Sequence, residues 1–172
     1  YTEKEPAGET FAARLCRDWE NEALAADKLG VRVVCMRTGL VLGKHGGALE
    51  KMTTPFKLFA GGRLGSGRQW MAWIHLDDVV NAYVTAAHDE RYKGPLNLVA
   101  GSVRNYDFAH ELGKAMHRPA WMPVPAFAIK AAVGAEFAES VLKGRRVVPS
   151  KLRELGFEWK YPTLDRALAA AV

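Results

Sequence analysis

The sequence predicts an α/β fold that is built on a parallel β-sheet. Thr10 can cap an amphipathic helix in which Phe11, Leu15 and Trp19 recur at helical spacing. Directly behind this helix, residues 31–36 are β-branched and nearly all apolar, as in a strand that is covered on both faces. A helix followed by such a strand is typical of a parallel sheet. We therefore expect the strand to be central, with the apolar helix face packed against it.

Beyond this strand, the sequence predicts one further short strand and several helices. Asp77 is expected to cap a helix whose core face contains Val80, Tyr83 and Val84, and residues 96–100 are expected to form a strand. Prolines separate short helical patterns in the last third of the chain. This part of the sequence predicts a small, mostly helical lobe.

Composition places the chain among ordinary globular proteins. Its 172 residues are 49% hydrophobic and 25% charged, which is enough for one substantial core. No apolar stretch approaches the roughly 20 residues that span a bilayer, and no signal sequence opens the chain. The chain begins with Tyr1 rather than methionine, so we expect it to be processed or truncated.

The cysteines and the net charge indicate the redox compartment and the kinds of ligand that are expected. Cys16 and Cys35 are isolated, which favours a reducing compartment, and no Cys or His pair has zinc-site spacing, so no metal site is predicted. The net charge is +5. A solvated surface is the simpler interpretation of this excess, and a site for phosphate groups or an acidic protein is the alternative. Nucleic acid is not supported, because no aromatics interleave with the basic cluster. That cluster comprises Lys143, Arg145, Arg146, Lys151, Arg153 and Lys160.

Polar residues and glycines follow the first predicted strand. They are Arg37, Thr38, Gly39 and, at the start of the next apolar run, Leu40. Parallel sheets place ligands at the carboxyl ends of their strands, so this loop is a candidate binding site, with a plain surface turn as the alternative. The glycine-rich run 61–67 is not a phosphate-binding loop, because no strand leads into it and no helix follows it directly.

An extended aromatic segment follows the glycine-rich run. Trp70 and Trp73 offer planar faces for stacking, while Gln69 and His75 have side chains that can orient a polar ligand. Ordinary packing is the alternative: the tryptophans would fill the core, and His75 and Asp77 would bond the backbone where the next helix starts.

Several multi-residue motifs occur in a fixed order along the chain. They are residues 15–20 (Leu-Cys-Arg-Asp-Trp-Glu), 37–43 (Arg-Thr-Gly-Leu-Val-Leu-Gly), 65–70 (Gly-Ser-Gly-Arg-Gln-Trp), 73–75 (Trp-Ile-His) and 156–158 (Gly-Phe-Glu). Together they resemble the atypical, extended short-chain dehydrogenase/reductase family, also described as NAD-dependent epimerase-like. The resemblance covers nearly the whole chain and is specific because several motifs match in order.

The resemblance implies the second half of an NAD(P)-binding Rossmann-type fold with a small, mostly helical C-terminal substrate lobe. Residues 1–45 would be the remaining part of the Rossmann domain. Residues 46–172 would be the substrate-side lobe, with residues 77–117 returning to the sheet. The family's Gly-x-x-Gly-x-x-Gly loop does not occur in this sequence. NADP or NAD is therefore implied for the full-length protein, and weak or no binding is expected for this chain alone.

The resemblance also implies roles for individual residues. Arg37, Thr38, Gly39 and Leu40 would line the nicotinamide end of the cofactor. Extended family members place a Tyr-x-x-x-Lys pair at the start of the helix that here begins at Phe11, where the tyrosine exchanges a proton with the substrate.

Two substitutions depart from the family's pattern. Phe11 and Leu15 occupy the positions of the Tyr-x-x-x-Lys pair, and Met71 replaces the arginine that holds the pyrophosphate of a nucleotide sugar. Neither Phe11 nor Leu15 can transfer a proton. A nucleotide sugar held in the usual way is therefore not expected.

These features predict an NAD(P)-dependent epimerase or oxidoreductase that acts on an unknown small molecule. Gln69, Trp70, Trp73 and His75 are the candidate substrate-binding residues, and His75 is a weak candidate for the catalytic base because of its intrinsic pKa. A non-catalytic scaffold or assembly subunit of a larger protein complex is the alternative, and a sensor of NAD(P) redox state is a third. The family is found in bacteria, mitochondria and plastids, so the cytoplasm or an organellar matrix or stroma is the expected compartment.

Overall fold

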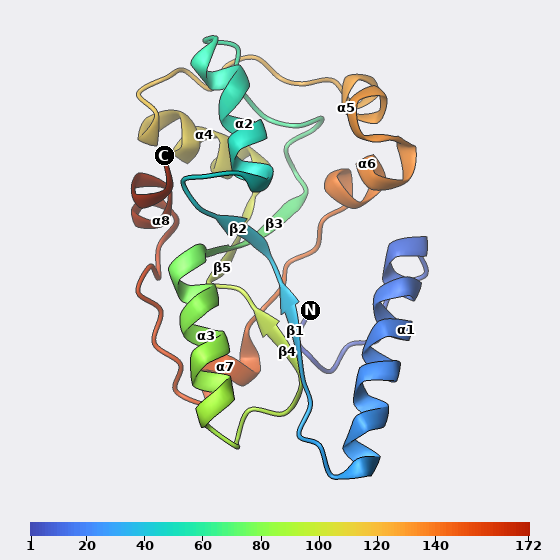
Figure 1. Cartoon of the computed structure of the whole chain (residues 1–172). Helices are drawn as coiled ribbons and strands as arrows, with labels where there is room; N and C mark the ends of the chain where they lie inside the picture. The colour runs from blue at the N-terminus through green and yellow to red at the C-terminus, as the bar shows by residue number, and fades with distance from the viewer.

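The computed structural model describes the backbone of residues 1–172, and the side chains of all of them except 132, 133, 135–137 and 140. Helices and strands alternate through the first two thirds of the chain, and helices alone follow (Figure 1). In chain order the elements are α1 (Phe11–Ala25), the 3-10 helix η1 (Ala26–Leu29), β1 (Val34–Thr38), β2 (Leu40–Leu42), α2 (Gly47–Lys57), β3 (Trp70–His75), α3 (Leu76–His88), β4 (Gly94–Leu98), β5 (Gly101–Arg104), α4 (Asn105–Ala115), α5 (Ala126–Val133), α6 (Ala135–Leu142), α7 (Ser150–Glu154) and α8 (Leu164–Ala171).

The strands form two small sheets. In the first, β1 and β4 are parallel, with Val34 opposite Gly94 and Thr38 opposite Leu98. In the second, β3 lies between β2, to which it is parallel, and β5, to which it is antiparallel. The predicted α/β fold with parallel strands is confirmed. The first strand begins three residues later than predicted, at Val34, and among the strands of the described chain it pairs only with β4.

The predicted packing of the first helix is wrong for this chain. Phe11 and Trp19 of α1 are 61% and 65% exposed, and Leu15 is exposed as well. Figure 1 shows why, because α1 stands to one side of β1 instead of lying on the two-stranded sheet. The strand is likewise not central, since one of its edges has no partner among the described residues.

Two apolar cores hold the rest of the fold together. One core joins β2, α2, α4 and α8 around Leu42, Phe56, Phe108 and Leu168, and the other joins α3 and β4 around Ile74. Their members are buried, so each removes a large apolar area from water.

Within the described residues, no helix is long and apolar enough to cross a membrane.

The predicted core face of α3 is also wrong. Val80, Tyr83 and Val84 are more than half exposed, whereas Asp78, Ala82 and Ala86 are buried. Alanines allow the helix backbone to approach the second core closely. The larger side chains lie on the other face of the helix.

Candidate functional site

A groove of about 1150 Å³ runs between α1 and the strands β1, β3 and β4. It brings together residues that are far apart in the sequence: Arg37 and Thr38 at the end of β1, Gly39 in the short loop after β1, Trp70 at the start of β3, and Arg145 from the segment after α6. Two of the predicted groups, the loop after the strand and the aromatic segment, therefore meet here. This groove is the candidate site.

The loop after β1 is held tightly at its glycine. A Cβ atom on Gly39 would lie 2.9 Å from both the carbonyl oxygen of Ala72 and a methyl group of Val99, so a larger residue does not fit. Thr38 is exposed beside it, and Leu40 packs against the first core. Of the predicted cofactor-binding residues, Thr38 and Gly39 thus line the groove, while Leu40 anchors the loop.

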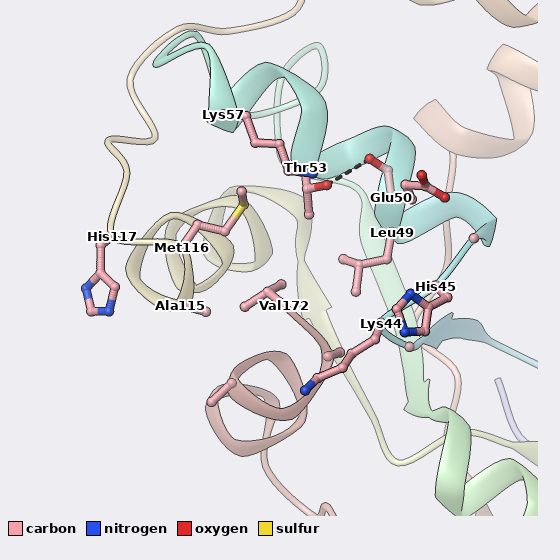
Figure 2. A pocket seen from close by; sticks show the side chains of 14 residues that line it. Lys44, His45, Leu49, Glu50, Thr53, Lys57, Ala115, Met116, His117 and Val172 are labelled. Carbon is pink, nitrogen blue, oxygen red and sulfur yellow. Dashed lines mark hydrogen bonds between the residues drawn. The ribbon is translucent and has the colours of Figure 1, made fainter.

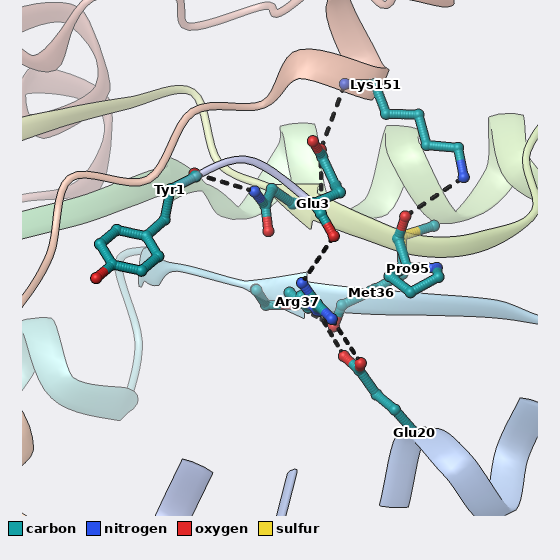
Figure 3. A network of polar contacts seen from close by, with 9 residues as sticks. Tyr1, Glu3, Glu20, Met36, Arg37, Pro95 and Lys151 are labelled. Atoms are coloured by element: carbon teal, nitrogen blue, oxygen red, sulfur yellow. Dashed lines mark hydrogen bonds and ion pairs between the residues drawn. The ribbon is translucent and has the colours of Figure 1, made fainter. Parts of the chain in front are cut away.

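The Arg37 side chain forms hydrogen bonds to other residues of the chain, as Figure 3 shows. Its guanidinium donates two hydrogen bonds of 2.7 Å to the Glu20 carboxylate of α1, which raise the pKa of Arg37. A third bond, of 3.5 Å, goes to the carbonyl oxygen of Glu3. The Glu3 carboxylate in turn accepts the backbone N–H groups of Asn97 and Lys151. Arg37 therefore ties α1 and the first residues of the chain to the sheet.

Two arginine side chains lie against the Trp70 ring. The Arg104 guanidinium lies 4.0 Å from the centre of the indole ring, and the Arg146 guanidinium lies 5.5 Å from it. Arg145 stands 4.6 Å above the Tyr1 ring on the wall of the same groove. Cation–π contacts of this kind hold the guanidinium groups in place. The result is a concentration of positive charge beside the groove.

Gln69 and Trp73 make structural contacts instead of lining the groove. Gln69 is buried, and its side-chain amide donates to the carbonyl oxygen of Leu64, 2.9 Å away, which fixes the glycine-rich run. Trp73 is buried in the first core, and its indole nitrogen is one of the buried polar atoms that lack a partner among the described residues. Their assignment as substrate-binding residues stays a prediction.

His75 lies at the other end of β3 and caps α3, so the predicted cap at Asp77 is wrong: Asp77 lies in the first turn of the helix. Its Nδ1 accepts the backbone N–H of Asp77 at 3.1 Å, and its ring centre is 3.9 Å from that of Tyr161. Burial lowers the pKa of His75 below its usual range. These contacts match the packing alternative, in which His75 bonds the backbone at the start of a helix.

Sequence reasoning did not find Arg104. Its place beside Trp70 follows from the antiparallel register of β3 and β5, which puts Trp70 directly opposite Arg104. Arg145 and Arg146 belong to the predicted basic cluster, for which an anionic partner is the alternative to a solvated surface. Within the described residues, no group of three or more His, Cys, Asp or Glu side chains is arranged to hold a metal ion.

A second pocket, of about 860 Å³, lies between α2, α4 and α8 (Figure 2). Its wall carries Lys44, His45, Lys57 and His117, and the Thr53 hydroxyl donates to the carbonyl oxygen of Glu50 at 2.8 Å. The pocket contains none of the predicted site residues. It shares no lining residue with the groove.

Comparison with known proteins relates this fold to one family. A family model described as the NAD dependent epimerase/dehydratase family matches residues 2–100, and one described as a domain of unknown function matches residues 124–171. The chain is 48% identical over 171 residues to a chloroplastic epimerase family protein of Arabidopsis thaliana, an SDR39U1 homolog, covering 99% of this chain and 49% of that protein. It is 42% identical over 171 residues to an epimerase family protein of Mycobacterium leprae, covering 98% of this chain and 55% of that one.

Solved structures agree with this. The crystal structure of the human epimerase family protein SDR39U1 with NADPH superposes with a TM-score of 0.91 at 35% identity, covering 99% of this chain and 58% of that one. The chain spans about half the length of the curated relatives that it matches. The resemblance seen in the motifs is confirmed. The chain belongs to the NAD-dependent epimerase/dehydratase family, within the extended short-chain dehydrogenases/reductases.

Proposed function

We propose that this chain is the substrate-side half of an NAD(P)-dependent oxidoreductase or epimerase, and that its substrate is a small molecule with a negative charge. One observation carries the proposal: the groove brings Thr38 and Gly39 together with Trp70 and Arg145, while Arg104 and Arg146 lie against the Trp70 ring. A cofactor end and a charged substrate end would then face each other across one cavity.

The cofactor would contact the loop after β1. The human relative SDR39U1 was solved with NADPH, and it is 35% identical to this chain. Arg37, Thr38 and Gly39 line the groove; the Arg37 guanidinium is paired with Glu20, so Thr38 and the backbone of Gly39 are the groups left for the cofactor, while Leu40 anchors the loop. In Rossmann proteins a glycine loop holds the pyrophosphate. Because this sequence contains no such loop, the 172 residues alone should bind NADPH no more tightly than about millimolar.

The substrate would lie against the arginines. Arg104, Arg145 and Arg146 form no ion pair with a carboxylate among the described side chains, so their positive charge is not neutralised there, although Arg104 donates one hydrogen bond to the carbonyl oxygen of Arg68. Guanidinium groups bind carboxylates and phosphates through paired hydrogen bonds. A carboxylate or phosphate on the substrate would therefore be recognised here, and Trp70 would keep two of the guanidinium groups in place.

His75 is poorly placed to act as the base at this groove. It lies at the far end of β3 from Trp70, roughly 17 Å along the strand at about 3.3 Å per residue. Its Nδ1 already accepts the Asp77 N–H. We propose that His75 orients α3 and that proton transfer at the groove relies on another group.

Turnover and binding test this function. The protein that contains this chain should oxidise or reduce members of a panel of hydroxy and keto acids with NADPH or NADH. Arg104→Gln with Arg146→Gln should raise KM for acidic substrates at least about tenfold, since two charged contacts are lost. Arg153→Gln, an exposed change elsewhere in the basic cluster, is the matched control. Equal KM values for the double variant and the control would remove the charged-substrate proposal.

A non-catalytic scaffold is the second candidate, and one observation favours it. Phe11 and Leu15 stand at the start of α1, where the family's proton-transfer pair would lie, and neither carries a proton to transfer. Calorimetry separates the two functions. Micromolar NADPH binding by the longer protein without turnover of any substrate would favour the scaffold, and micromolar binding by the 172-residue chain alone would contradict the cofactor site described above.

A further inference from the structure

An exposed apolar patch lies where α2 ends. We call it the aromatic patch, and it consists of Leu58, Phe59, Trp121 and Met122, which are 73%, 56%, 66% and 39% exposed. Figure 1 shows the end of α2 and the loop that leads into α5 at one end of the molecule, away from β1 and β4. Contiguous exposed aromatics of this kind are uncommon on a surface that meets only water.

Specific contacts build the patch. A backbone bridge joins Gly61 to Ala120, so the two segments run side by side. The Trp121 indole nitrogen donates to the carbonyl oxygen of Phe59 at 3.0 Å, and the Arg118 guanidinium lies 4.5 Å from the centre of the Phe59 ring. Phe59 has φ of 59°, a left-handed conformation that is unfavourable for a bulky residue. The exposed Phe59 ring is therefore carried by a residue whose backbone conformation is strained.

The two chain segments that form the patch carry an excess of basic residues. Residues 51–76 and 112–135, which include both halves of the patch, contain no aspartate or glutamate. A shallow hollow of about 410 Å³ beside the patch is lined by His110, Lys114, His117 and Arg118; Lys114 is paired with Glu111 at 2.8 Å, whereas Arg118 has no carboxylate partner among the described side chains. The cations of the two acid-free segments are Lys51, Lys57, Arg63, Arg68, Lys114, Arg118 and Lys130.

From this combination we infer that the aromatic patch docks onto the surface of an anionic phospholipid bilayer. Exposed Trp, Phe and Leu side chains next to Lys and Arg are typical of interfacial attachment, in which the apolar groups enter the headgroup boundary and the cations meet lipid phosphates. The Trp121 N–H is already bonded within the protein, so its ring enters that boundary without losing a hydrogen bond to water. Charge and apolar surface therefore point to the same partner.

A second copy of the chain fits this surface less well. In a symmetric dimer the patch would face itself. Each acid-free segment would then meet cations instead of carboxylates, and juxtaposed like charges oppose association. An anionic bilayer satisfies the same cations.

Vesicle co-sedimentation tests the inference. The protein should bind vesicles of phosphatidylcholine with about 30% phosphatidylglycerol much more than pure phosphatidylcholine vesicles, and added salt should weaken the binding. Leu58→Ser with Phe59→Asn should lower the partition coefficient at least about tenfold, because two apolar anchors are lost. Asparagine tolerates the left-handed conformation, so this variant should fold. Leu29→Ser, a change at an exposed leucine in η1, is the matched control and should bind as the parent does.

Three results would overturn the inference. The first is equal binding to neutral and anionic vesicles, and the second is parental binding by the Leu58→Ser, Phe59→Asn variant. The third is a concentration-dependent dimer in sedimentation that the same variant abolishes, which would assign the patch to a second copy. Lys57→Gln with Arg118→Gln supplies an independent arm, since it leaves both anchors in place and should still weaken binding to anionic vesicles.

Discussion

Replacing Asp78 with alanine should destabilise the protein strongly. The residue is fully buried, and its carboxylate accepts the backbone N–H groups of Lys160 at 2.7 Å and Tyr161 at 3.1 Å. These bonds join the start of α3 to the segment before α8. A hydrogen bond to a charged group contributes about 1.5–3 kcal/mol, so loss of both should cost about 3–6 kcal/mol. In a chain of this size the Tm should fall by roughly 6–24 °C.

The neighbouring aspartate provides the control. Asp77 pairs with the Lys160 ammonium at 2.7 Å, but both side chains are exposed, so Asp77→Ala should change the Tm much less. Asp78→Asn keeps one acceptor oxygen and should fall between the two. Urea unfolding followed by circular dichroism measures all three variants. Equal losses for Asp77→Ala and Asp78→Ala would refute the role of the buried carboxylate as an anchor.

Three further changes test other parts of the structure. Gly39→Ala should cost about 1–3 kcal/mol through overpacking, whereas Gly8→Ala, where the added methyl group meets nothing closer than 3.8 Å, should cost far less; urea midpoints compare them. Burial lowers the folded-state pKa of His75, so the unfolded state binds its proton first as the pH falls. The stability that neutral His75 contributes should be complete above about pH 6.5 and decline as the pH falls toward the folded-state pKa, and urea midpoints across this range should lose that slope in His75→Asn. Glu20→Gln breaks the bidentate pair with Arg37 and should speed amide hydrogen exchange in α1, the helix that this pair ties to β1; unchanged exchange would show that other contacts hold the helix.

Local signals predicted part of the secondary structure, but not the short strands β2 and β5. The Thr10 side chain accepts the backbone N–H of Ala13 at 3.2 Å, so the predicted cap of α1 is confirmed. The parallel strand was also predicted, with a shift in its start. Caps and strand composition act over a few residues, and a sequence shows them directly.

Packing was harder to predict, because it depends on what covers each face. In α3, the large apolar residues Val80, Tyr83 and Val84 outweigh the alanines in any hydrophobic pattern, yet the alanine face is buried. The burial of Asp78 depends on two N–H donors more than 80 positions later. No helical pattern in the sequence carries that information.

The site shows the same division between local and distant signals. The loop after β1 and Trp70 were both predicted as ligand-binding, and the groove places them together. The arginines beside Trp70 were not predicted to lie there, because Arg104 arrives through the strand register and Arg146 through a chain segment with no regular structure. Separations of 34 and 76 positions leave too many pairings open for a single sequence to choose between them.

One glycine explains how the late basic segment reaches the groove. The backbone N–H of Trp70 donates to the carbonyl oxygen of Gly144 at 3.1 Å, and a Cβ on Gly144 would lie 2.1 Å from the Trp70 carbonyl oxygen. Only glycine permits this approach. Arg145 and Arg146 follow directly, so the contact at Gly144 brings their guanidinium groups to the Tyr1 and Trp70 rings. The position of the positive charge of Arg145 and Arg146 therefore depends on Gly144. Because glycine is uncharged and has no side chain, a search of the sequence for basic motifs does not identify it.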